Sequence, residues 1–144
     1  MTEKTYTQSP WSLKELFDSF EDPKIEETYQ TLTRNVEQFE SYRDELSPDI
    51  STERFLEIIR GWEESQKLGY KLYGFSSLSF AANTQDQKAQ IGISRVQQFL
   101  AEIENRTLFF SLWWKALDDQ NAARLLDASG DYRYFLEQIR NMRP

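Results

Sequence analysis

Carboxylates are the most numerous side chains with chemical potential in this sequence, which has 24 Asp and Glu among 144 residues. They include three adjacent pairs, Glu26-Glu27, Glu63-Glu64 and Asp118-Asp119. Two carboxylates can serve a glycosidase or hold a divalent cation, but they must converge in a cleft from separate elements. Neighbours on a helix point about 100° apart. We therefore expect these pairs to cap helices or face solvent. An independent carboxylate-based enzyme is one of three hypotheses for the function of this chain.

Histidine and cysteine are both absent from the sequence. Histidine is the commonest general base and zinc ligand, and cysteine supplies thiolate nucleophiles and disulfides. A Ser-His-Asp triad and a His-Glu-x-x-His zinc helix are therefore impossible within these residues. The sequence predicts no catalytic, cofactor-binding or metal-binding residue in this chain.

The net charge of the chain is -7. Nucleic acids and anionic membranes bind clustered Lys and Arg, so we expect neither as a partner. The opening residues contain no apolar run that could form a signal peptide, and no stretch approaches the roughly 20 apolar residues of a membrane span. These features favour a cytoplasmic location.

Apolar residues recur at alternating steps of four and three, which is typical of amphipathic helices. The longest such series is Ala89, Ile93, Val96, Leu100, Ile103, Thr107, Phe110, Trp114 and Leu117. We predict an all-α fold with three long antiparallel helices in a bundle, an N-terminal arm and two short C-terminal helices. Residues 1–144 then form a single helical domain, with the arm at 1–22, the long-helix bundle at 23–117 and the short helices at 118–144.

Local signals predict where the helices begin and end. Asp22-Pro23, Ser51, Thr84 with Gln87, and Asp118 are expected helix starts, because their side chains can accept from the free N–H groups of a first turn. Gly130 is an expected stop. In the second helix, the buried side is expected to run from Phe55 to Tyr73, and its three glycines predict close helix contacts or a kink.

Aromatic residues cluster near the end of the third predicted helix. Phe110 and Trp114 continue the apolar series, whereas Phe109 and Trp113 lie on an adjacent strip. A wide apolar face is usually internal, and the alternative is a surface that docks against another domain. The candidate docking surface consists of Phe109, Trp113, Phe135 and Ile139. Three tyrosines are expected either at the rim of the core or in a peptide site: Tyr70, Tyr73 and Tyr132.

Four stretches of the chain carry a family resemblance. They are Trp11–Phe17, the run from Tyr70 to Thr84, the run SLWWKALDD at 111–119, and the Leu125-Leu126 pair followed by SGDYRYFL at 129–136. In order and spacing they resemble the N-terminal region of the oligoendopeptidase F family of zinc metallopeptidases. The resemblance covers nearly the whole chain.

The resemblance implies a largely helical enzyme whose N-terminal helices form part of the wall of a channel for short peptides. Zinc would be bound by a His-Glu-x-x-His helix and a further Glu, all downstream of Pro144. On this interpretation the chain is the non-catalytic N-terminal fragment of a peptide-hydrolysing parent, inactive alone, with the downstream catalytic domain of the same polypeptide as its partner. The abrupt end after an apolar face agrees with that expectation. The alternative is a free-standing helical interaction or dimerisation module, and the fragment could also self-associate.

Overall fold

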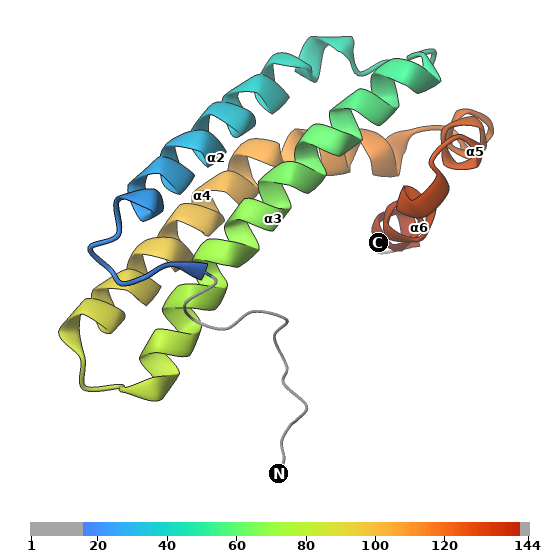
Figure 1. The fold of residues 1–144 in the computed structure, drawn as a ribbon. Coiled ribbons are helices and arrows are strands. Elements are labelled where there is room, and N and C mark those ends of the chain that lie inside the picture. Colours follow the sequence, from blue (N-terminus) through green and yellow to red (C-terminus); the bar gives the residue numbers. More distant parts are fainter. Residues whose placement is uncertain (1–15, 142–144) are drawn as a thin grey trace. The chain divides into compact units, whose positions relative to one another are not determined.

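The computed structural model describes residues 16–141, and these residues form five α-helices, two 3-10 turns and no strand (Figure 1). The helices are α2 (Pro23–Ser41), α3 (Thr52–Ala82), α4 (Gln87–Ala116), α5 (Asp119–Asp127) and α6 (Arg133–Asn141). The 3-10 turns are Arg43–Glu45 and Gly130–Tyr132. The predicted all-α class is thus confirmed, whereas the first part of the expected arm, with the motif that starts at Trp11, lies outside the described residues.

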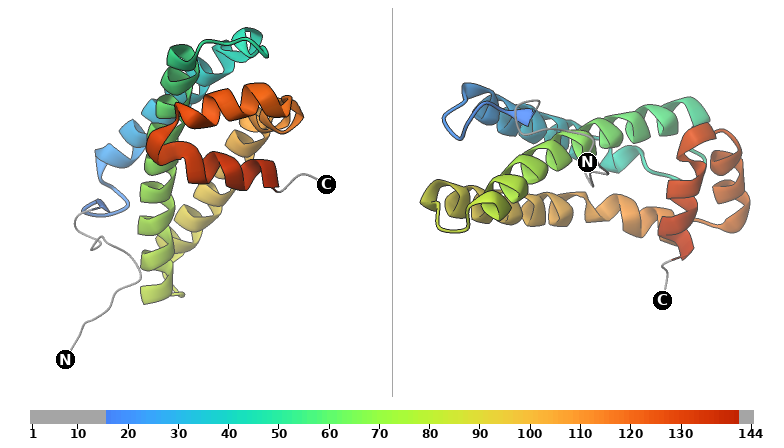
Figure 2. Two further views of the ribbon diagram at one scale, coloured as in Figure 1. Left: turned by 90° about the vertical axis from the view of Figure 1, so that its right-hand side faces the viewer. Right: turned by 60° about the horizontal axis from the view of Figure 1, so that its bottom comes forward.

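The described chain divides into two compact units, and each long helix contributes to both. The first unit consists of residues 16–32 and 67–101, and the second of residues 33–66 and 102–141. Figure 2 gives two further views, in which the connection between α3 and α4 within the first unit is a short turn.

The first unit has a core of large apolar side chains from all of its segments. Its buried residues include Leu16, Phe17, Tyr29, Leu32, Leu72, Phe75, Ala89 and Val96. Phe75 makes edge-to-face contacts with the rings of Phe17 and Phe20, at centroid distances of 5.3 and 4.8 Å. These contacts fix the segment before α2 against α3.

The second unit has an aromatic core. Its fully buried members include Phe55, Ile58, Phe110, Trp114, Leu125 and Leu136. The ring centroid of Phe110 lies 4.9 Å from that of Trp62 and 5.7 Å from that of Phe39. Rings from α2, α3 and α4 therefore meet, and α5 and α6 add Leu125 and Leu136 to the same cluster.

Three of the predicted helix starts are confirmed by hydrogen bonds. Asp22 accepts from the backbone N–H of Lys24, and Ser51 accepts from that of Arg54. Asp118 accepts from the N–H of Asn121 at the start of α5. Each bond satisfies a first-turn donor that has no partner inside the helix.

The predicted start at Thr84 is wrong. The side chain of Asp86 accepts from the N–H of Lys88 at 3.0 Å, and its carbonyl oxygen accepts from the N–H of Gln90. Asp86 therefore caps α4, which begins at Gln87 rather than at the residue after Thr84. Thr84 and Asp86 could both cap this helix. Asp86 does so, because it is the residue directly before Gln87, the first residue of α4.

Helix α3 is continuous through its three glycines. Of the two expectations for these glycines, close contact is met at Gly69, where an added Cβ would lie 3.2 Å from the Leu100 side chain. Tyr73, expected on the buried side of α3, is instead 41% exposed.

Candidate functional site

The four expected docking residues all lie in the second unit, with different environments. Phe109, Trp113 and Ile139 are half-buried and pack against the aromatic core. Phe135 is exposed, although it makes an edge-to-face contact with Trp62 in which the two ring centroids are 5.3 Å apart. Three of the four therefore contribute most of their surface to the interior of the unit.

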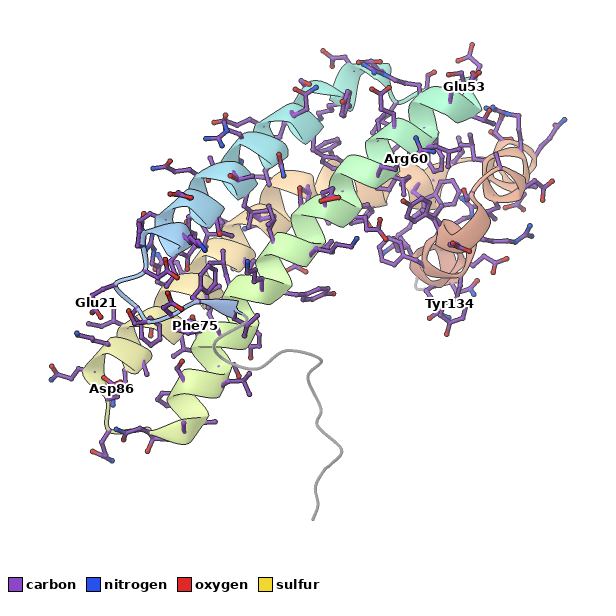
Figure 3. All side chains as sticks on the ribbon, in the orientation of Figure 1. Glu21, Glu53, Arg60, Phe75, Asp86 and Tyr134 are labelled. Atoms are coloured by element: carbon purple, nitrogen blue, oxygen red, sulfur yellow. The ribbon has the colours of Figure 1, made fainter. Side chains whose placement is uncertain are left out.

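Other large apolar side chains of the second unit are more exposed than those four. Leu112 is 57% exposed and Tyr134 72% exposed, and Leu108 stands one helical turn before Leu112 on α4. Figure 3 labels Tyr134, whose side chain points away from α6. Leu112 lies on the same predicted strip as Phe109 and Trp113, whereas Leu108 and Tyr134 lie on neither that strip nor the apolar series and were not predicted as surface residues. The four-residue spacing of Leu108 and Leu112, outside the main series, is a sequence signal that could have predicted an exposed apolar strip.

The carboxylate pairs are dispersed among structural roles. Glu26 pairs with Arg95, Glu63 accepts from the Tyr132 hydroxyl, and Asp118 caps α5. Asp119 pairs with Arg140 at 2.8 Å. Within residues 16–141, no group of three or more acidic, His or Cys side chains is arranged to hold a metal ion.

The three tyrosines considered for a peptide site do not share one environment. Tyr70 and Tyr73 are exposed on α3 in the first unit, and Tyr132 is half-buried in the second. Burial, together with the hydrogen bond to Glu63, raises the pKa of Tyr132. Tyr132 thus fits the core-rim interpretation.

A pocket of about 220 Å³ lies in the first unit, between the segment before α2 and helices α2, α3 and α4. Its wall is mainly apolar. Four aromatic rings line it, from Phe17, Phe20, Tyr29 and Phe75, together with Ile25, Leu72 and Ile91. Glu21 and Phe75, which both line this pocket, are labelled in Figure 3.

The α4 wall of the pocket is built by residues at helical spacing. Lys88, Ile91, Gly92 and Arg95 recur at steps of three, one and three, so they share one face of the helix. A Cβ at Gly92 would overlap the ring of Phe20, with further ring atoms at 3.1 and 3.2 Å. The glycine therefore allows the Phe20 ring to lie directly on the α4 backbone.

Two ion pairs border the pocket. Arg95 donates two hydrogen bonds to Glu26 and lies 3.8 Å from the centre of the Tyr29 ring. This pairing lowers the pKa of Glu26. Lys88 pairs with Glu21 at 2.6 Å, and this hydrogen bond lowers the pKa of Glu21. The Arg95 guanidinium is held from two sides, whereas the Lys88–Glu21 pair stands in solvent, with both side chains more than 60% exposed.

Comparison with family models, with curated proteins and with solved structures finds no match. The pocket and the exposed apolar residues therefore have to be interpreted from their own chemistry and from the resemblance described above. Within residues 16–141, no helix has both the length and the apolar character needed to cross a membrane.

Proposed function

We propose that this chain is a non-catalytic helical domain of a longer zinc-dependent oligoendopeptidase, in which it forms part of the wall of the peptide channel. Zinc and the residues that activate water would belong to the downstream catalytic domain. The parent would hydrolyse peptide bonds in short peptides, in the cytoplasm.

The observation that carries the proposal concerns the segment from Ser111 to Leu136, which bears most of the resemblance. Three large exposed apolar side chains, Leu112, Tyr134 and Phe135, occur on this segment. Large apolar patches on soluble domains are usually covered by a partner. A catalytic domain in the same polypeptide is the partner that the resemblance supplies.

The proposal includes an arrangement of the helices. The three long helices would run antiparallel as one bundle, residues 1–22 would form an arm, and α5 and α6 would close one end. Contacts inside each unit support this arrangement: Phe39 of α2 meets Trp62 of α3, and Tyr29 of α2 meets Phe99 of α4.

The decisive experiment identifies the native product. An antibody raised against this chain should detect a protein several times larger than 17.1 kDa, and its sequence should contain a His-Glu-x-x-His motif downstream of Pro144. A native product that ends at Pro144 would overturn the proposal. As a second test, the purified 144-residue chain should cleave no peptide with or without added zinc, and zinc-dependent cleavage by it would also contradict the assignment.

A free-standing interaction module is the second candidate function. Leu108 and Leu112 favour it, because exposed leucines one turn apart on α4 form the kind of apolar stripe through which helices dimerise. This candidate predicts a native product of the present length and a concentration-dependent dimer. The size of the native product therefore separates the two functions.

A further inference from the structure

We propose that the pocket of the first unit binds the C-terminal residue of a short peptide, with an apolar side chain among the aromatic rings and the α-carboxylate at Lys88 and Arg95. The choice of a peptide rests on the proposed function. The underlying chemistry, an apolar group that carries a carboxylate, is argued from the pocket itself.

The volume of the pocket fits one side chain. An apolar cavity of about 150 Å³ is large enough to hold benzene, whereas pockets for drug-sized ligands start at about 300 Å³. At about 220 Å³ the pocket has room for a phenyl or branched aliphatic group and not for a folded segment. The rings of Phe17, Phe20 and Phe75 offer edges and faces to such a group.

The charges on the wall favour an anionic head group. Lys88 and Arg95 both line the pocket, and each is paired with one carboxylate, Glu21 and Glu26 respectively. Glu26 is outside the lining, whereas Glu21 is part of it. A ligand carboxylate would therefore bind by replacing Glu21 at Lys88, which keeps the charges at the pocket paired.

The two cations differ in how they could act. Arg95 is fixed by Glu26 and by the Tyr29 ring, and its two bonds to Glu26 use two of its five N–H donors. Lys88 is paired with Glu21 at the surface, where an ion pair contributes little and exchanges readily. Lys88 can therefore turn from Glu21 to a ligand carboxylate at small cost, while Arg95 stays fixed beside it with N–H donors that Glu26 does not use.

The position of Ile91 indicates where a ligand would enter. Ile91 lies between Lys88 and Arg95 on the same face of α4 and is 68% exposed, yet it lines the pocket. An apolar side chain that entered there would cover Ile91 and bring its carboxylate close to both cations. Burial of that surface adds to the affinity.

The test uses the full 144-residue chain and follows backbone amide shifts by NMR. The probes are acetyl-Gly-Phe with a free carboxylate, acetyl-Gly-Phe amide, and 3-phenylpropanoate. With the first probe we expect saturable shifts at Phe75, Ile91 and Gly92, and none at Gly130 in the second unit. Affinity for the amide should be at least about fivefold weaker, because it lacks the charge.

Three variants keep the test independent of folding. Lys88→Gln, at an exposed position, should weaken binding of the carboxylate by about three- to tenfold and leave binding of the amide unchanged. Glu21→Gln should strengthen binding of the carboxylate probe by about two- to fivefold, since this change removes the carboxylate that competes for Lys88. Lys67→Gln, an exposed change of the same charge outside the pocket, serves as the matched control and should bind like the unaltered chain.

The outcomes divide as follows. Absence of saturable shifts at the three pocket amides, at a probe concentration of about 10 mM, would overturn the proposal. Equal affinity for carboxylate and amide would overturn the role of the two cations. Equal affinity for 3-phenylpropanoate and acetyl-Gly-Phe would show that the pocket binds a free apolar acid, and would overturn the proposal that its ligand is a peptide. None of these results depends on the size of the native product, so failure here is distinguishable from failure of the proposed function.

Discussion

Arg140 and Trp114 contact each other through both main chain and ring. The Arg140 guanidinium donates to the carbonyl oxygen of Trp114 and lies 5.4 Å from the centre of its ring. In turn, the indole N–H of Trp114 donates to the carbonyl oxygen of Leu136 at 2.8 Å. The last turn of α4, which has carbonyls without partners inside the helix, is therefore bound directly to α6.

Arg140→Lys should destabilise the chain, because Lys cannot reproduce the fork that reaches both Trp114 and Asp119. Arg140 is only 8% exposed, and without its fork the Trp114 carbonyl would keep only the long 3.4 Å hydrogen bond from the Leu117 N–H; loss of a buried charged hydrogen bond costs roughly 1–3 kcal/mol of unfolding free energy. Urea unfolding followed by tryptophan fluorescence measures the change. Arg133→Lys, on the exposed side of the same helix, is the control and should leave the midpoint almost unchanged; equal effects of the two would contradict the role of Arg140.

Gly92→Ala should destabilise the first unit, although alanine favours helix. The added methyl would collide with the Phe20 ring, and overpacking costs about 1–3 kcal/mol against a propensity gain of about 1 kcal/mol. Gly61→Ala is the matched control, since a Cβ there meets nothing within 4 Å, and it should stabilise the chain by up to about 1 kcal/mol. If both variants were equally stable in urea, Phe20 would not lie on the Gly92 backbone.

Acid should weaken the chain through the pairs Glu40–Arg106 and Glu26–Arg95. Hydrogen bonds from the arginines lower the pKa of both glutamates below the ordinary value of 4.5. A carboxyl whose pKa is lower in the folded state contributes stability above its unfolded pKa, and this contribution is lost as the pH falls through the folded pKa. Each pair is partly solvated, so the contribution is at most about 1 kcal/mol.

Glu40→Gln isolates one of these pairs. The variant should be slightly less stable than the original chain at about pH 7, and the difference should be smaller at about pH 3, because Glu40 gains its proton as the pH falls through its lowered pKa. Urea midpoints at the two pH values measure the difference. A constant difference between the two proteins across this range would show that Arg106 does not stabilise the ionised carboxylate.

Leu112→Glu should leave the unfolding free energy of the 144-residue chain within about 0.5 kcal/mol, because the side chain is largely exposed. In the longer parent that we propose, the same change would place a charge in a covered apolar interface and lower stability by more than about 1 kcal/mol. Val96→Glu, at a fully buried position, should unfold both proteins and serves as the positive control. An identical small effect of Leu112→Glu in both proteins would show that this face stays uncovered.

Much of the fold was predictable because helix caps and apolar spacing are local signals. Asp22, Ser51 and Asp118 each combine an acceptor side chain with a favourable first turn, and all three cap as expected. Thr84 failed because Asp86, two residues later, competes for the same role. A short polar turn offers several acceptors, and only the backbone geometry selects one.

The site was less predictable than the helices. Spacing placed Phe109 and Trp113 on a second strip, but it could not show that rings of α2 and α3 would cover them. The ring centroids of Phe39 and Phe109 are 5.3 Å apart, and those of Phe55 and Trp113 are 6.1 Å apart. The pocket of the first unit depends on residues far apart in sequence, such as Phe20 and Gly92. Long-range juxtapositions of this kind leave no periodic signal.

Gly130 has a φ of +54°, the only positive value among residues 16–141. At this position the backbone has the handedness that a D-amino acid prefers. Space does not limit the side chain, since a Cβ there would meet nothing within 4 Å. In a chemically synthesised chain, D-alanine at position 130 would therefore stabilise the turn between α5 and α6 by restricting the unfolded state, while its mirror image, L-alanine, would strain it by about 1 kcal/mol.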